Sequence, residues 1–523
     1  MNLNSIPDDS RIIRALTGRT RPANWSLRPM VVVYCFFPAF VILLVSALLN
    51  TEYPNWPDQF ALSLCTFGAL LILGDRPLLN PLQALVFLFH WWFAWGPAVC
   101  SFFFYVSDDL PQSSHFVSGD GGAILIVALG QLLFALCAAL TLRLFRKFRV
   151  GLSFLLPEGV LYSPRTLVTY SAVAAAAYAL TGVLGLFGIR AFEDVNFLGG
   201  QKTVSPLLAA IVPITQLGQF ATVGLIGYLV LRRTAGGPLL KFATILTLLG
   251  NIAFALQSGS KTPIILPLFY VGLVYFTYRQ RIPWTLCISL LAFYVVFVEP
   301  FVASSRTASN SQNANSSDDR VEIFRQKLRE GSFAALNWRE INIESPFRFI
   351  YSEAIQVAAI SEMNSGPWAG ESLENGFSTM VPRFLSPQKA DSNMGNYFAH
   401  QLGEAGEGDE TYNISITIPF EFVGNYGFVA GILSFGLLGF FWTAILCFLL
   451  SEQRLATHPL MPVCVTLIMT VEGSVGQMAN GLKLLPIPIL AAWVVFIAVR
   501  RKTRVSLMPG PVSSARPARL GIA

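Results

Sequence analysis

Long apolar stretches, separated by short polar loops, recur along most of the chain. A helix needs about 20 apolar residues to cross the hydrocarbon core of a bilayer, and many of these stretches approach or exceed that length. The pattern predicts an all-α polytopic membrane protein with about 12 transmembrane helices and one large extracytoplasmic loop. The apolar windows lie at about 30–49, 59–74, 82–105, 122–142, 167–188, 207–231, 242–258, 263–278, 283–302, 427–450, 459–475 and 485–499.

Clusters of Lys and Arg all fall on one side of the membrane if every window crosses it. Short cytoplasmic loops carry such an excess, whereas the loops at 51–59 and 107–121 are acidic or neutral. We therefore predict a multi-pass protein of the bacterial cytoplasmic (inner) membrane with both termini in the cytoplasm. The first window is too long for a signal peptide, so a retained helix is expected. The later clusters are Arg143, Arg146, Lys147 and Arg149; Arg232, Arg233 and Lys241; Arg279 and Arg281; and Arg500, Arg501, Lys502 and Arg504.

This orientation divides the chain into five segments. Residues 1–29 form a cytoplasmic tail, 30–302 hold helices one to nine, 303–413 form the large extracytoplasmic loop, 414–499 hold an outer-face helix and helices ten to twelve, and 500–523 form a basic cytoplasmic tail. The loop begins with a Ser/Asn-rich run and continues with two amphipathic helical patterns, the second beginning near Ser345-Pro346 and marked by Ile350, Ala354 and Val357. Function is expected there because the loop is the longest polar part of the chain.

The composition agrees with a multi-pass membrane protein and argues against several other classes of protein. Of the 523 residues, 54% are hydrophobic and 13% are charged, about half the charged fraction of a soluble domain. The net charge of +6 is small and follows the loops, so no nucleic-acid partner is expected. The 7 Cys lie in or beside apolar runs, which predicts neither disulfides nor a metal site. Few ionisable residues and no internal repeat occur in the spans, which argues against an ion-coupled carrier.

The loop contains a stiffened cationic segment, MVPRFLSPQK, followed by YFAH. Two prolines restrain the backbone around Arg383, and Lys389 adds a second cation a short distance away. Arg offers a bidentate fork to phosphate oxygens, so Arg383 and Lys389, with His400, are candidates for a phosphate or pyrophosphate site. The alternative interpretation is that these are solvated loop side chains.

Other candidate residues lie outside that segment. The hinge SGSKT contains Lys261 but lacks the upstream glycine and strand of an ATP-binding loop, so Lys261 either contacts phosphate or anchors the helix at the interface. Arg190 and Arg348 either add cations to an anion site or lie on the surface. Glu421 and Asn425, in the segment TYNISITIPFEFVGNYG, either face a substrate groove or cap a helix.

Three segments together resemble the oligosaccharide repeat-unit polymerases, the Wzy-type O-antigen and exopolysaccharide polymerases. They are VPRFLSPQK at 381–389, SGSKTPIILPL at 258–268 and EFVGNYGFVAGILSFGLLGFFW at 421–442, and the likeness in layout covers roughly 160–450. The resemblance implies a GT-C-like membrane glycosyltransferase that transfers a growing glycan from undecaprenyl pyrophosphate to a lipid-linked repeat unit. It implies no cofactor, nucleotide sugar or metal.

The resemblance also implies roles and partners. Cations would bind the lipid pyrophosphate, and a base would activate the acceptor hydroxyl. The partners would be the undecaprenyl-pyrophosphate-linked oligosaccharide, membrane lipid, and a chain-length regulator and a flippase. One departure is that the loop after the fifth window offers only Arg190 and Lys202, without a second arginine motif. The expected pyrophosphate-binding residues are Arg383, Lys389, Arg348, Lys261 and Arg190, and the candidates for the catalytic base are His400 and Glu421.

Other functions share some of these features. An O-antigen ligase would use the same donor and cations but a lipid A-core acceptor. A lipid-linked glycan transporter or flippase would have a similar number of spans, but it would not need a long loop with a stiffened Pro-Arg segment, and it would usually show inverted repeats. A mannosyltransferase that uses a lipid monophosphate sugar would employ acidic residues of the first outer loops, such as Asp108 and Asp109.

Overall fold

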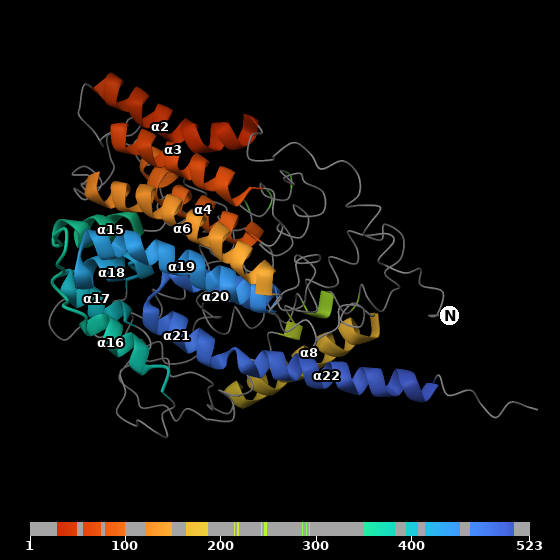
Figure 1. Ribbon diagram of the computed structural model, residues 1–523. Coiled ribbons are helices and arrows are strands. Elements are labelled where there is room, and N and C mark those ends of the chain that lie inside the picture. Colours follow the sequence, from red (N-terminus) through yellow and green to blue (C-terminus); the bar gives the residue numbers. More distant parts are fainter. Residues whose placement is uncertain are drawn as a thin grey trace, which may run out of the picture.

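The computed structural model describes nine stretches of the chain, together with a few isolated residues between 214 and 292. All of the secondary structure in these stretches is helical (Figure 1). Six helical stretches are long and apolar enough to cross a membrane, as expected of a helical membrane protein: Pro29–Leu48, Trp56–Leu73, Pro81–Val99, Gly122–Phe145, Phe428–Leu449 and Val475–Val495. The described stretches are 29–49, 56–74, 79–99, 121–148, 164–186, 350–381, 394–405, 414–449 and 461–506.

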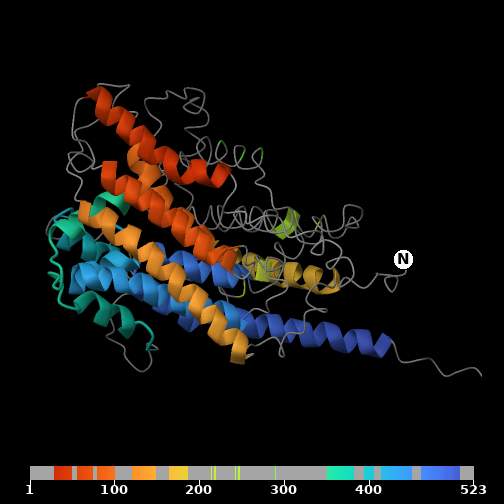
Figure 2. The ribbon, with the colours of Figure 1, turned by 45° about the horizontal axis from the view of Figure 1, so that its top comes forward.

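A bundle of long helices forms the body of the described structure. Helix α6 lies at its centre and packs against α3 and against α19, and both views show these helices side by side (Figures 1 and 2). Large apolar side chains such as Phe40, Leu129 and Leu437 are exposed on the bundle, as expected of helices that face lipid. The bundle helices are α2 (Pro29–Leu49), α3 (Trp56–Leu73), α4 (Asn80–His90) with the π-helical turn η3 (Trp91–Trp95), α6 (Gly121–Phe148), α8 (Pro164–Leu186) and α19 (Phe428–Leu449).

Helices α6 and α19 approach each other closely because glycines line the contact. A Cβ at Gly439 would collide with the backbone oxygen of Phe134, and a Cβ at Gly130 would collide with the ring of Phe435. Small residues allow such close approach between helices in membranes. This contact holds the start of α19 in place, and α18 leads directly into that start.

The last part of the chain forms a helical hairpin whose turn differs from the prediction. Helices were expected at 459–475 and 485–499, with a connection between them. Instead the turn lies at Gly473 and Ser474, where the Ser474 hydroxyl accepts a hydrogen bond from the Gln477 amide (3.3 Å), and the expected connection is helical. Hydropathy locates an apolar run, whereas a capping side chain fixes where the helix begins. The hairpin consists of α20 (Met461–Met469), the short 3-10 helix η8 (Thr470–Glu472), α21 (Val475–Leu484) and α22 (Pro486–Ser506).

Six of the other predicted windows correspond to described helices, and four lie almost entirely outside the described residues. The first five and the tenth coincide with described helices, and α8 is joined to α22 by a bond from the Tyr170 hydroxyl to the Ala492 carbonyl (3.2 Å). The sixth to ninth windows, residues 207–302, lie outside the described residues apart from isolated positions.

Four short helices gather at one end of the bundle, at the left of Figure 1, and we call residues 350–381, 394–405 and 414–426 the cap. The predicted helix marked by Ile350, Ala354 and Val357 is confirmed as α15, with Ala354 and Val357 fully buried. The C-terminal end of α22 lies at the opposite end of the bundle in both views. The cap helices are α15 (Ile350–Ala359), α16 (Glu371–Ser378), α17 (Gly395–Gln401) and α18 (Ile418–Tyr426).

Candidate functional site

The connection between α15 and α16 is hydrogen-bonded to the junction of α18 and α19 through the backbone of both segments. The amide of Trp368 donates to the Gly424 carbonyl (2.9 Å), and the amide of Phe428 donates to the Glu362 carbonyl (3.0 Å). Gly366 must be glycine for this fit, because a Cβ there would collide with the Gly424 backbone. The cap is therefore attached to the bundle by backbone contacts as well as by side chains.

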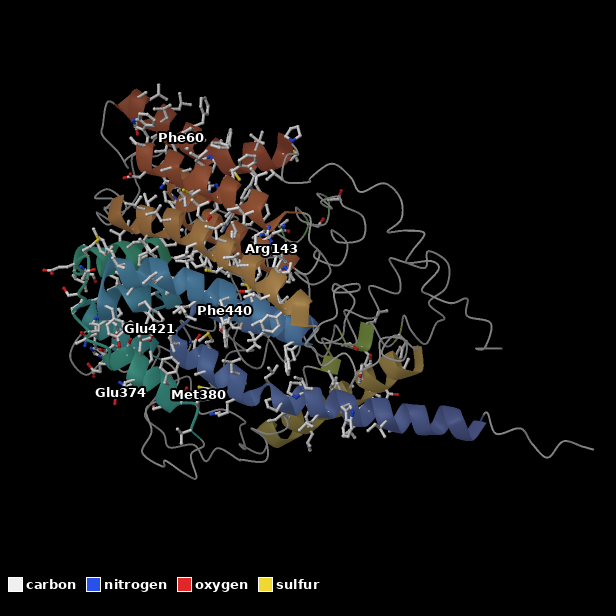
Figure 3. All side chains as sticks on the ribbon, in the orientation of Figure 1. Phe60, Arg143, Glu374, Met380, Glu421 and Phe440 are labelled. Carbon is white, nitrogen blue, oxygen red and sulfur yellow. The ribbon has the colours of Figure 1, made fainter. Side chains whose placement is uncertain are left out.

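Glu421 lies at the point where its own helix α18 meets α16 and α21 (Figure 3). Its side chain is 0% exposed. One carboxyl oxygen accepts a hydrogen bond from the Ser372 hydroxyl on α16 (3.0 Å), and the other accepts one from the amide of Val475 (2.7 Å). The first amides of a helix have no partner within the helix, so Glu421 on α18 caps α21 from outside.

A second shared residue completes this cluster. The Asn425 amide nitrogen donates to the Ser372 hydroxyl (2.7 Å), and its amide oxygen accepts from the Gly370 backbone (2.9 Å). Burial is the main influence on Glu421 and raises its pKa to about 8, although the bonds from Val475 and Ser372 oppose the shift. Glu421 is therefore mostly a neutral acid at pH 7.

This geometry bears on the two interpretations of Glu421. A general base must lie within hydrogen-bond reach of the proton that it removes. Both oxygens of Glu421 are already bonded to protein groups, and neither is exposed. The arrangement is that of a carboxyl group that joins helices, which agrees with the capping interpretation.

The residue at the N-cap of α18 has an unusual backbone conformation. Thr417 has φ of 65° and ψ of 149°, which is uncommon for a β-branched residue, and its carbonyl accepts from the Glu421 amide (3.0 Å). Its hydroxyl is buried without a hydrogen-bond partner in the described part of the chain. Backbone strain of this kind gathers at functional positions, and the sequence carries no signal for it.

His400 differs from Glu421 in being exposed. Its helix, α17, is fixed to the cap by the Phe398 ring, which stacks on Trp368 at 5.2 Å between centroids. The Tyr397 hydroxyl adds a bond to the Glu371 carboxylate (3.1 Å). Of the two candidate bases, His400 is therefore the one that a substrate in solution can reach.

The five predicted cations, Arg383, Lys389, Arg348, Lys261 and Arg190, lie outside the described residues. The residues that flank the Pro-Arg segment are described, and both belong to the cap: Val381 follows α16, and Met394 precedes α17. Beside Val381, the Thr379 hydroxyl donates to the Gly476 carbonyl (3.2 Å), and the Thr379 carbonyl accepts from the Lys483 ammonium (3.1 Å). The structure thus ties the start of this segment to α21.

A second buried acid in the cap was not predicted. Glu353 on α15 is 7% exposed, and burial, with a smaller contribution from Glu404, raises its pKa well above the usual value. One of its oxygens is buried without a hydrogen-bond partner in the described stretches. Glu353 lies three residues after Ile350 and four before Val357, so its spacing places it on the apolar face of α15, a signal that the sequence analysis did not use.

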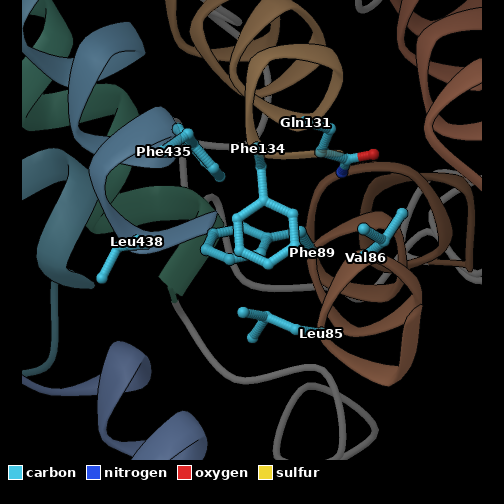
Figure 4. A pocket seen from close by; sticks show the side chains of 7 residues that line it. All are labelled: Leu85, Val86, Phe89, Gln131, Phe134, Phe435 and Leu438. Carbon is cyan, nitrogen blue, oxygen red and sulfur yellow. The ribbon is translucent and has the colours of Figure 1, made fainter. Parts of the chain in front are cut away.

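His90, one of the few ionisable residues expected within a span, belongs to a polar cluster inside the bundle. The Thr66 hydroxyl lies 3.1 Å from the His90 Nδ1 atom and donates to the Gln131 amide oxygen (2.7 Å). Gln131 also borders a narrow crevice between α4, α6 and α19 that has no room for a water molecule (Figure 4). Its other lining residues are apolar: Leu85, Val86, Phe89, Phe134, Phe435 and Leu438.

Comparisons with known proteins do not assign the chain to a family: no family model, no curated protein and no solved structure matches it. Within the described residues, no three His, Cys, Asp or Glu side chains come together in a way that could hold a metal ion. The geometry of the cap and the resemblance in sequence are therefore the basis for a functional hypothesis.

Proposed function

We propose that the chain is a polysaccharide polymerase that joins undecaprenyl-pyrophosphate-linked oligosaccharide repeat units at the outer face of the bacterial cytoplasmic membrane. The observation that carries the proposal is that the cap holds both flanks of the Pro-Arg segment, Val381 and Met394, together with the exposed His400. A lipid pyrophosphate donor needs cations and a base within reach of one another. The resemblance to the repeat-unit polymerases falls on the same segment.

The distribution of basic residues supports the orientation in this proposal. Arg143 lies toward the end of α6 that is far from Glu421 (Figure 3). The basic stretch of α22, including Arg500 and Arg501, also belongs to the end opposite the cap. Because Lys and Arg mark the cytoplasmic side, the cap would face outward, where lipid-linked repeat units would be joined.

The proposed reaction is a glycosyl transfer without a cofactor. His400 accepts the proton of the acceptor hydroxyl as that oxygen bonds to the anomeric carbon of the donor glycan. The bond from the anomeric carbon to the pyrophosphate oxygen breaks, and the lipid pyrophosphate leaves with the electron pair. Arg383 and Lys389 stabilise the charge of this leaving group, and His400 then releases its proton to water.

The polymerase proposal is tested by Arg383→Ala in the native host, with the protein level checked by blot. We expect the surface or secreted polysaccharide to change from a long-chain ladder to single repeat units on a gel. Arg325→Ala removes an arginine from the same loop and is the matched control, expected to keep the ladder. Loss of all glycan would favour export or ligation, and an unchanged ladder would contradict the site.

The choice between the two candidate bases has its own test. His400→Gln should abolish polymerisation in membranes, because glutamine cannot accept the proton. Glu421→Gln should retain most of the activity, because an amide can replace a neutral acid that serves only to join helices. The reverse result would make Glu421 the base and would refute our assignment of His400.

A further inference from the structure

Helix α16 has a buried face and an exposed stripe of mixed character. Its buried face contains Ser372, Leu373 and Gly376, and a Cβ at Gly376 would lie 2.9 Å from the Gly476 amide nitrogen at the start of α21. α16 therefore packs directly against α21. The exposed stripe follows the other side of the helix at a spacing of three to four residues.

The chemistry of that exposed stripe changes along the helix. Glu371 and Glu374, in its first turn, are exposed. Phe377 (51% exposed), Met380 (44%) and Val381 (40%) follow at its other end. An ordinary water-facing stripe would be polar throughout, so one end of α16 suits water and the other suits an apolar surrounding.

The apolar end of α16 lies alongside a membrane-spanning helix. Ser372, near the start of α16, shares Glu421 with Val475, the first residue of α21. Thr379, one residue past the end of α16, is reached by Lys483, eight residues further along α21, which corresponds to about 12 Å of helix. The Thr379 hydroxyl also donates to the Gly476 carbonyl (3.2 Å), so the C-terminal end of α16 lies beside the first turn of α21, and the long Lys483 side chain reaches back to it.

The candidate span that starts at Val475 gives this apolar end a natural partner. The span continues into α22, where Leu490 (57%), Trp493 (38%) and Val494 (58%) are exposed. The apolar end of α16 therefore lies at the start of a candidate membrane span. A charged side chain at that depth is costly unless it is paired, and the Lys483 ammonium beside Thr379 donates to the Thr379 carbonyl (3.1 Å).

We propose that α16 enters the bilayer beside α21, with Glu371 and Glu374 at the polar interface and with Phe377, Met380 and Val381 against lipid hydrocarbon. The partner of this surface is the bilayer lipid itself. The inference needs only the membrane-spanning fold and not the proposed reaction.

Collision measurements on spin labels test this depth directly. Single cysteines at Glu374, Phe377 and Met380, in a protein whose seven native Cys are replaced by Ala, would carry a nitroxide in phosphatidylglycerol and phosphatidylethanolamine vesicles. Oxygen gathers in hydrocarbon, whereas a water-soluble nickel complex does not enter it. We expect labels at 377 and 380 to collide with oxygen several times more than with nickel, and the label at 374 to show the opposite preference.

Two exposed residues supply matched controls. Gln401→Cys lies at the end of α17 in the cap, is exposed, and should behave as a water-exposed site. Leu437→Cys on α19 (60% exposed) should behave as a lipid-facing site. If the labels at 377 and 380 resemble the one at 401, or if the label at 437 is accessible to nickel, the proposal is wrong.

A second measurement avoids replacement of the native cysteines. A photoreactive benzoylphenylalanine at 377 or 380 in the otherwise natural chain should form phospholipid adducts on illumination, detected by mass spectrometry. The same group at 401 should form none. Adducts at all three positions or at none would contradict the proposal, and neither result depends on whether the protein polymerises glycans.

Discussion

Two buried polar clusters, one in the cap and one in the bundle, satisfy their hydrogen bonds to different degrees. In the cap, both oxygens of Glu421 and both polar atoms of the Asn425 amide have partners. In the bundle cluster of Thr66, His90 and Gln131, two buried atoms have no hydrogen-bond partner among the described residues: His90 Nε2 and Gln131 Nε2. Both clusters are almost completely buried, so the difference does not come from exposure to water.

The difference follows from where each cluster meets the backbone. Glu421 reaches the free amide at the start of α21, and Asn425 reaches the amide of Gly370 just before α16. Helix ends offer such groups because their amides have no partner within the helix. In the middle of long helices the backbone is already paired, so Thr66, His90 and Gln131 depend on one another. Polar networks are completed most easily where helices begin and end.

The largest effect is expected when the carboxyl group of the cap cluster is removed. Glu421→Ala leaves the Val475 amide and the Ser372 hydroxyl buried without an acceptor, which should cost roughly 2–5 kcal/mol of the free energy of unfolding. Glu421→Gln should cost less than about 1 kcal/mol, because its amide oxygen can still accept from Val475. Thermal melting of the purified protein in detergent measures both changes.

A control for this prediction acts on the partner of Glu421. Val475→Pro removes the amide hydrogen and replaces the buried valine side chain with the proline ring, which fits the first position of a helix, especially after an extended residue such as Ser474. It should destabilise the protein by about 1–2 kcal/mol in wild type and by less in the Glu421→Ala background. Equal costs in both backgrounds would mean that the Glu421–Val475 bond is not what holds the cap cluster together.

The next largest effect should be a difference in the pH dependence of stability between wild type and Glu421→Gln. Burial raises the pKa of Glu421 from 4.5 to about 8, so the folded protein holds one proton more than the unfolded chain between these values. The free energy of unfolding should therefore fall as the pH rises from about 5 to about 8, and level off above the folded pKa. The melting temperature of Glu421→Gln should fall less steeply than that of wild type, because only the raised pKa of Glu353 remains to produce a fall. Parallel curves for the two proteins would show that Glu421 does not titrate with folding.

The bundle cluster should respond less to the loss of a polar group. Gln131→Leu removes an amide that is only partly satisfied, so its effect should stay within about 1 kcal/mol of wild type and could be stabilising. Thr66→Ala should cost more, about 1–3 kcal/mol, because it leaves both His90 Nδ1 and the Gln131 oxygen without their shared partner. Thermal melting in detergent compares the two variants. A larger loss of stability for Gln131→Leu than for Thr66→Ala would contradict the proposed difference between the bundle cluster and the cap cluster.

Part of the candidate site could be predicted from the sequence. Glu421 was singled out by its place beside a Gly-rich window, and His400 by its distance from the Pro-Arg segment, because both are local features. Ser372, Thr379 and Val475 were not singled out as site residues. Ser372 lies 49 residues from Glu421 along the chain, and Val475 lies 54 residues from it, so no local pattern records these contacts.

The sequence by itself determined the apolar helices and the position of α15. Each of these depends on the transfer of nearby side chains between water and lipid, which composition records directly. Only the tertiary structure decided that the hairpin turns at Gly473 and Ser474, that Glu421 is buried with both oxygens bonded, and that His400 is exposed. Those outcomes depend on which helix ends meet, and that is settled by packing between distant segments.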